Sequence, residues 1–350
     1  MEKNYTIKDI AQLAGVSKGT VDRVIHKRGR VSTKAADKVN AVLAKIEYKP
    51  NPIAKSLKNN KVYRISILLP KADTDPFWQP CYSAITQVEK EFGHFGIKLE
   101  QWHFNPEDTQ TFITAGLKAI KSKPVAILMV PLFFNEAENL IKKCSEAKIK
   151  VATFNNYIKQ SKVDLFIGQD LNQSGRVAAS LFNVLLQKNS TIAVLHIDEV
   201  FQNASHMQEK ECGFKGYFST KNIKNFRIQV HNLKKESGRP FENTIEHFVK
   251  TNANALDGIF VTTSKAYLLA DQIANHTNKT IIIGYDLVAD NITHLTNQNI
   301  SFLIHQDPKK QVYLSLTYLI EHFLFDNPLR EEQLLPIDIV NAENYSQYLT

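Results

Sequence analysis

Apolar residues in the first 46 positions recur three or four residues apart, which is the spacing of one face of a helix. Thr6 and Asp9 fit a capping box at the start of the first helix, and Gly15 fits its left-handed end. Ser17 is expected to cap a second helix over 17–26, and Ser32 a third. A helix, a glycine turn and a short second helix braced by a third predict a helix-turn-helix domain.

From residue 62 onward, short continuous apolar runs alternate with amphipathic segments. Buried strands are expected at 63–70, 126–131, 151–154, 165–168, 191–197, 258–262 and 280–285. Helices are expected between them at 81–95, 109–121, 136–147, 174–186 and 265–276. Strands that are apolar on both faces and alternate with helices predict parallel sheets covered on both sides. Two such sheets account for the length of this region.

The positive charge of the chain is concentrated in the predicted helical domain. The 350 residues carry a net charge of +8. Residues 1–61 contain 14 Lys and Arg against 5 Asp and Glu, whereas the other 289 residues contain 29 against 30. A three-helix bundle that only braces the body would not need this charge. Because neutralising phosphates supplies most non-specific DNA affinity, the charge favours a DNA-binding domain.

Composition and motifs remove several classes of protein. The 43% hydrophobic and 22% charged fractions are those of a globular protein. The three cysteines lie more than 60 residues apart, so neither a disulfide framework nor a cysteine zinc cluster is expected. No apolar signal segment or membrane-length run occurs, so we expect a cytoplasmic protein with no membrane partner. The sequence lacks GxGxxG, GxxxxGK[ST], GxSxG and HExxH motifs, so we expect no enzyme activity, cofactor or metal.

Several short motifs follow one another in register along the first 51 residues. They are TIKDIA at 6–11, AGVS at 14–17, TV at 20–21, RV at 23–24, VS at 31–32 and YKPN at 48–51. This run closely resembles the headpiece of the lactose-repressor (LacI/GalR) family. The resemblance implies a sequence-specific DNA-binding transcriptional regulator, normally a repressor, that works as a homodimer on double-stranded operator DNA.

The same resemblance implies the architecture of the whole chain. It consists of an all-α helix-turn-helix headpiece over 1–50, a hinge over 51–62, and a two-lobed α/β effector domain over 63–350. The body resembles the periplasmic sugar-binding-protein fold, with two doubly wound parallel sheets. We expect an N-lobe at about 63–168 plus 305–332 and a C-lobe at about 169–304 plus 333–350.

By this resemblance, the helix at 17–26 enters the major groove. Lys18 can donate to guanine, whereas Gly19 has no side chain with which to read a base. Asp22 departs from the usual small hydroxyl residue, and either accepts from cytosine or holds Arg23 or Lys18 in place. Basic residues farther along are expected to hold phosphates. The predicted headpiece contacts to DNA are Thr6, Ser17, Lys18, Thr20, Arg23, His26, Arg28 and Arg30.

Residues 50–61 separate the headpiece from the body. Asn51 can cap a helix with Pro52 in its first position, but one or two turns are too few for a helix that is stable alone. The resemblance implies that two such hinge helices pair in the minor groove, with Leu57 wedged into a base step and Ala54 beside it. A solvated linker is the expected state away from DNA.

In this fold a small ligand binds between the lobes, beyond the carboxyl ends of the strands. The sequence DPFW at 75–78 resembles a loop of sugar-binding relatives that stacks aromatic rings on a sugar, although both rings could instead belong to the core. Loops after other expected strands offer amides and carboxylates for hydroxyl groups. The predicted effector-binding residues are Asp75, Phe77, Trp78, Asn155, Asn156, Asp170, Gln208, Ser264, Asp286 and Gln306.

This set departs from the pattern of sugar binders in the family. Those usually have Asp-Arg in place of Asn155-Asn156, Arg in place of Gln208, and Asn-Asp in place of Thr263-Ser264. An amide-rich, uncharged rim predicts a neutral sugar or polyol. A nucleoside or phosphorylated sugar, an activator, a sensor without DNA binding and an architectural DNA protein are the alternatives. The C-terminal segment has no apolar heptads, so a dimer is expected rather than a tetramer.

Overall fold

The computed structural model describes residues 5–25, 29–46, 48, 62–73, 75–158, 161–197, 205–234, 240–274 and 280–349. The chain divides into two compact units, Met1–Lys61 and Val62–Thr350, and each is described by itself. The predictions made for His26, Arg28, Asn51, Ala54 and Leu57 lie outside the described residues. Across the described ranges, no helix has the length and apolar character needed to cross a membrane.

The described residues of the first unit form helices α1 (Ile7–Ala14), α2 (Lys18–Ile25) and α3 (Thr33–Lys45). The capping box is confirmed: the Thr6 backbone N–H donates to Asp9 Oδ2 (2.8 Å), and the Asp9 N–H donates to Thr6 Oγ1 (3.3 Å). Gly15 ends α1 at φ 64° and ψ 39°, the left-handed conformation that glycine adopts without strain. Ser32 precedes α3, but its side chain makes no capping hydrogen bond.

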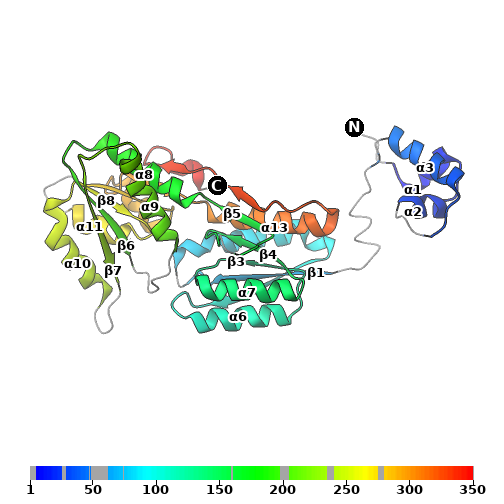
Figure 1. Ribbon diagram of the computed structural model, residues 1–350, viewed down its shortest axis with the longest axis horizontal. Helices are drawn as coiled ribbons and strands as arrows, with labels where there is room; N and C mark the ends of the chain where they lie inside the picture. Colours follow the sequence, from blue (N-terminus) through cyan, green and yellow to red (C-terminus); the bar gives the residue numbers. More distant parts are fainter. Residues whose placement is uncertain are drawn as a thin grey trace. The chain divides into compact units, whose positions relative to one another are not determined.

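The body contains two six-stranded sheets. In the first lobe the strand order is β11-β5-β4-β3-β1-β2, and all pairs are parallel. The strands are β1 (Tyr63–Pro70), β2 (Ile97–Phe104), β3 (Ala126–Met129), β4 (Lys150–Phe154), β5 (Leu165–Gly168) and β11 (Glu332–Leu334). Helices α5 (Gln79–Phe92) and α13 (Pro308–Phe325) cover one face, and α6 (Thr109–Lys121) and α7 (Phe134–Glu146) cover the other (Figure 1).

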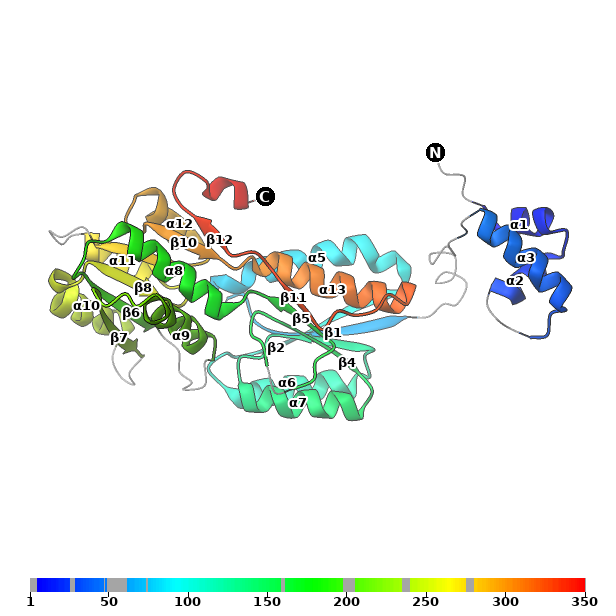
Figure 2. The ribbon, with the colours of Figure 1, turned by 45° about the horizontal axis from the view of Figure 1, so that its top comes forward.

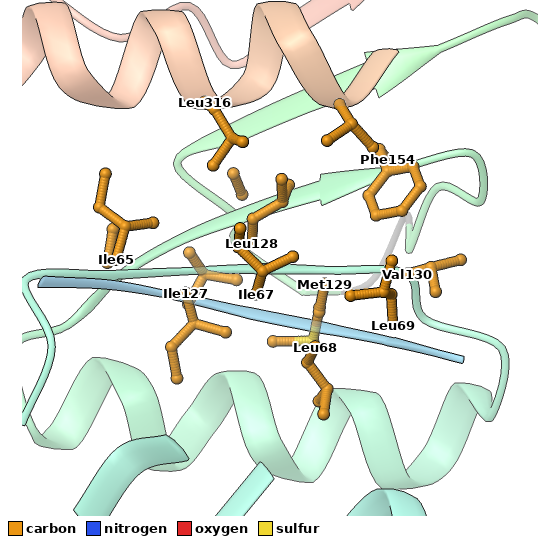
Figure 3. Packing of buried hydrophobic residues seen from close by; sticks show 14 of the residues in the cluster. Ile65, Ile67, Leu68, Leu69, Ile127, Leu128, Met129, Val130, Phe154 and Leu316 are labelled. Atoms are coloured by element: carbon orange, nitrogen blue, oxygen red, sulfur yellow. The ribbon is translucent and has the colours of Figure 1, made fainter. Parts of the chain in front are cut away.

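The central strands of this sheet are buried on both faces. Figure 3 shows Ile65 and Ile67 of β1 on the side of Leu316 from α13, and Leu68 on the opposite side with Ile127 and Met129. Successive side chains of a strand point to opposite faces, so a strand between two helical layers needs an apolar residue at every position. This is the physical reason for the continuous apolar runs in the sequence.

In the second lobe the strand order is β12-β10-β9-β8-β6-β7. The strands are β6 (Thr191–Ile197), β7 (Arg227–Leu233), β8 (Gly258–Val261), β9 (Ile281–Tyr285), β10 (Phe302–His305) and β12 (Asp338–Val340). Helices α8 (Leu171–Leu185) and α9 (Ser205–Thr220) pack in one core cluster with the sheet, and α10 (Phe241–Asn252), α11 (Tyr267–Ala274) and α12 (Ala289–Thr296) pack in the other (Figure 2).

The expected fold class is confirmed, and the seven expected strands are present as β1, β3, β4, β5, β6, β8 and β9. The edge strands β2 and β7 have partly exposed side chains and therefore lack a continuous apolar run. β12 pairs antiparallel with β10, so the second sheet is not wholly parallel. The sequence analysis placed the return of the chain to the second lobe at about residue 333. However, β11 (332–334) pairs with β5 in the first lobe, so the chain returns to the second lobe at β12.

Helices α8 and α9 approach so closely that backbone meets backbone. A Cβ atom placed on Gly213 of α9 would overlap the carbonyl oxygen of Asn172 in α8, and one on Gly175 of α8 would overlap that of Lys210 in α9. Glycine at these two positions therefore determines how near α9 lies to α8. Gly216, one turn farther along α9, has only the tip of the flexible Arg176 side chain nearby.

We expect Gly213→Ala to lower the free energy of unfolding by about 1–3 kcal/mol, because the added methyl forces the helices apart. Gly216→Ala is the matched control. It should raise the free energy of unfolding by up to about 1 kcal/mol, because alanine favours the helix and space is available. Thermal and urea unfolding of the two variants beside the parent protein measure the difference. Equal stability of the two variants would contradict the close packing of α8 and α9.

Candidate functional site

The headpiece presents its predicted DNA-contacting residues at and after the turn between α1 and α2. Lys18, Arg23 and Arg30 are exposed. The Thr20 N–H donates to Ser17 Oγ (3.2 Å), and the two hydroxyls lie 3.0 Å apart, so Ser17 caps α2 as predicted. A side chain at Gly19 would make only ordinary contacts with Arg23 and Ser17.

The loop after β1 places its aromatic residues inside the first lobe. Asp75 Oδ1 accepts the Phe77 N–H (2.9 Å) and so caps the short helix η1 (Pro76–Trp78). Phe77 and Trp78 are only 8% and 5% exposed, and their rings meet edge to face at 4.7 Å. Trp78 also lies 6.5 Å from the ring of Phe154, the last residue of β4. The pair therefore forms part of the core next to the loop after β4.

That loop begins with two buried amides. Asn155 has a positive φ of 65°, and its backbone N–H donates to Oε1 of Gln311 in α13 (2.8 Å). Asn155 Nδ2 and Asn156 Oδ1 are buried and have no hydrogen-bond partner among the described residues. Gln169, directly after β5, is also buried. The amides expected at these strand ends are thus drawn inward by the fold.

Asp286 follows β9 in the second lobe and is almost completely buried. Its Oδ1 accepts the Gln306 N–H (2.9 Å) and its Oδ2 accepts Gln306 Nε2 (2.6 Å). His305 Nδ1 lies 3.8 Å from Oδ1. Burial raises the pKa of the Asp286 carboxyl above its usual value, while the nearby positive charges of His305 and Lys210 oppose that rise.

Lys210 is a buried cation that the sequence analysis did not single out. Its side chain is 2% exposed, and its Nζ donates to the Thr262 carbonyl (2.9 Å) and lies 3.6 Å from the centre of the Tyr285 ring. The helical spacing of Met207, Lys210 and Phe214 places all three on the buried face of α9, and this periodicity was the available signal. The expectation of an uncharged rim was based on Asn155-Asn156, Gln208 and Thr263-Ser264, and it did not take this buried cation into account.

Other predicted residues are arranged differently. Asp170 is exposed and caps α8 by accepting the Gln173 N–H (2.8 Å). Gln208 is exposed on α9, two residues before the buried Lys210. Ser264 is buried, and its carbonyl accepts Asn291 Nδ2 (2.8 Å). The structure thus brings Asp286 together with Gln306, and Gln306 with Gln311 and Asn155, but leaves Asp170 and Gln208 at the surface.

Among the described residues, several buried polar atoms without a hydrogen-bond partner lie at or just after the carboxyl ends of strands in the two lobes. Such atoms are costly unless a water or a ligand satisfies them. They include both donors and acceptors, and a hydroxyl group can pair with either kind. The atoms are Thr153 Oγ1, Asn155 Nδ2, Asn156 Oδ1, Gln169 Oε1, Thr263 Oγ1 and His305 Nδ1.

Comparison with known proteins agrees with this arrangement. Residues 65–324 match the periplasmic binding protein domain family, and residues 6–51 match the lacI family of bacterial regulatory proteins. The sucrose operon repressor of Streptococcus mutans is 25% identical over 350 residues, which cover 97% of this chain and 98% of that protein. The ribose operon repressor of Escherichia coli K12 is 44% identical over 125 residues, or 36% of each chain.

Among solved structures, the chain is similar to one assigned as a LacI transcriptional regulator from Bacteroides fragilis. The TM-score is 0.75 with 24% sequence identity, and the similarity covers 82% of this chain and 100% of that one. At this identity the match establishes the shared fold of the body.

The raised pKa of Asp286 predicts a pH dependence of stability. A buried acid of this kind binds its proton more tightly in the folded state, so its stabilising effect is lost as the pH rises through the folded-state pKa. Asp286→Asn removes this titration because asparagine has no ionisable proton. The Gln306 amide can rotate to pair with the new side chain, so the hydrogen bonds are kept. We therefore expect the melting temperature of the parent protein to fall relative to Asp286→Asn as the pH rises from about 4.

Thermal unfolding of both proteins across a pH series measures this difference. The exposed Asp170→Asn is the control, since asparagine caps a helix about as well as aspartate. A pH-independent difference between the parent and Asp286→Asn, or one of opposite sign, would contradict the assignment.

Proposed function

Because the chain belongs to the lacI family of bacterial regulatory proteins and carries a periplasmic binding protein domain, we propose that it is a homodimeric, cytoplasmic repressor controlled by a neutral sugar or polyol. The headpiece would bind a two-fold symmetric operator, since a two-fold dimer implies a two-fold site. The effector would bind where the two lobes meet, at the carboxyl ends of the strands.

The observation that carries the effector proposal is the set of buried, unpartnered polar atoms at the strand ends. Asn155 and Asn156 in the first lobe and Thr263 in the second offer both donors and acceptors. A hydroxyl group donates and accepts at once, so a polyhydroxylated ligand can satisfy this mixture. An apolar ligand would leave the same atoms unsatisfied at a cost of about 1–3 kcal/mol each.

The charges in the site support a neutral ligand. Lys210 is a buried cation, which by itself would favour a phosphorylated sugar. However, Asp286 lies close enough for each charge to act on the other, and Lys210 already donates to the Thr262 carbonyl. Lys210 thus already has interaction partners within the protein, so an anionic ligand gains less from it than from an exposed cation. The phosphorylated sugar is the second candidate because of Lys210.

Regulation would follow from movement of the lobes. A ligand that contacts both lobes favours one relative arrangement of them, and this changes the geometry that the hinge segments 51–62 need on DNA. Linkage then requires operator DNA to change effector affinity by the same factor as the effector changes operator affinity.

We expect one neutral sugar or polyol to give a saturable tryptophan fluorescence change. The chain has two tryptophans, so Trp102→Phe leaves Trp78, beside Phe154, as the only reporter. The panel includes sucrose, D-ribose, polyols, nucleosides and sugar phosphates. For the sugar that binds, Thr263→Val should weaken binding about tenfold, because a buried hydroxyl partner is lost.

Thr317→Val is the matched control for this experiment. Thr317 lies on α13 and also has a buried hydroxyl, but it does not follow a strand end. The Thr317→Val variant should bind the sugar with the same binding constant as the parent protein. Binding of sugar phosphates alone would reject the neutral class, and equal losses in both variants would reject the strand-end site.

For the headpiece, we expect selection from random DNA with the full-length protein to give a two-fold symmetric consensus. Lys18→Ala should relax the preference at one base position by about 1–3 kcal/mol. Arg30→Ala should weaken binding to all DNA sequences alike and lower the salt dependence of binding by about one phosphate contact. A base preference altered by Arg30→Ala but not by Lys18→Ala would reverse the two roles.

For the hinge, Leu57→Ala should weaken operator binding and leave effector affinity nearly unchanged.

A further inference from the structure

Three connections join the two lobes, and one buried side chain bridges all of them. They run from β5 to α8, from β10 to α13 and from β11 to β12. Gln169 lies in the first. Its Nε2 donates to the carbonyl of His305 at the second connection (2.8 Å) and to that of Pro336 in the third (2.6 Å). The two amide hydrogens of Gln169 therefore bind carbonyls of two different connections.

The surroundings of Gln169 show that this bridge is built into the fold. The side chain is 3% exposed, so water does not compete freely for its hydrogen bonds. The backbone supports the same junction, because the Leu335 N–H donates to the Gly168 carbonyl (2.7 Å). That bond joins the first and third connections only, whereas Gln169 also reaches the second.

The bridge continues into the candidate effector site. His305, whose carbonyl accepts from Gln169, has its ring Nδ1 3.8 Å from Asp286 Oδ1. The next residue, Gln306, binds both carboxylate oxygens of Asp286, and its carbonyl accepts Gln311 Nε2 (2.7 Å). The position of the second connection therefore determines the position of several groups around Asp286.

Rotation of one lobe against the other changes backbone torsions in the connecting segments. If the three segments were independent, each could absorb that change differently and the lobes could twist as well as close. We propose that Gln169 is a positioning residue of the effector response, which ties the three connections into one pivot and keeps His305 beside Asp286. Its relevance to regulation rests on the proposed function, whereas the tie itself is made by protein groups alone.

Hydrogen exchange of the effector-free, full-length protein tests the proposal. In Gln169→Met, which keeps the size but loses both donors, amides of the connecting segments 168–171, 304–308 and 334–338 should exchange about tenfold faster. Amides of β3 and β6, inside the two sheets, should keep their parent rates. Gln169→Asn keeps the amide but is one methylene shorter, and should give the same local pattern if the methionine variant does not fold.

Gln333→Met is the matched control, because Gln333 lies on β11 next to the third connection and is not among the bridging groups. It should leave all three segments at the parent rate. Unchanged exchange in the Gln169 variants, uniform acceleration through both lobes, or equal acceleration in Gln333→Met would each overturn the proposal.

A distance measurement gives a second, independent readout. Spin labels at Lys142 on α7 and Val184 on α8 report the spacing of the lobes, and both positions are exposed. Cys81 and Cys144 are buried, so replacing the exposed Cys212 by serine removes background labelling. The distance distribution should become at least about twice as wide in Gln169→Met, because loss of the tie permits more lobe orientations. An unchanged width would overturn the proposal.

Discussion

Every buried hydrogen-bonding group needs a partner, and this requirement governs the region where the two lobes meet. Within the sheets the backbone ladders supply those partners, but the ladders end at the carboxyl ends of the strands. Side chains there must pair with each other, with another connection or with a ligand. Gln306 pairs with Asp286, Gln169 with two carbonyls, and Asn155 and Thr263 keep atoms for which the described residues supply no partner. The same requirement thus governs both the junction of the lobes and the polar side chains of the candidate site.

Patterns in the sequence predicted the layered sheets because burial on both faces leaves little choice of residue. β1 and β6 were predicted at their observed bounds, since nearly every position in them is apolar. β2 and β7 were missed because an edge strand exposes part of its surface and accepts polar residues there. The headpiece was more predictable than the body, since Thr6, Asp9 and Gly15 act through contacts within a few residues.

The site was only partly predictable, because its residues meet through contacts distant in sequence. Loops after strands were identified, and the structure buries Asn155, Asn156 and Asp286 there. Whether a loop residue turns inward depends on the neighbouring helix, which is why Asp170 caps α8 at the surface. Lys210 was missed because a lysine on a helix is normally solvated. Its burial depends on the aromatic ring of Tyr285 and the carbonyl of Thr262, 75 and 52 residues away along the chain.

The headpiece has a core of its own, in which Ile10, Val21 and Val39 are completely buried and all other members come from residues 5–48. Its packing is therefore encoded separately from that of the body. In evolution, recombination within the segment that follows could exchange one headpiece for another without disturbing the core of either unit. Under the proposed function, such an exchange changes the DNA target while the ligand stays the same, or the reverse.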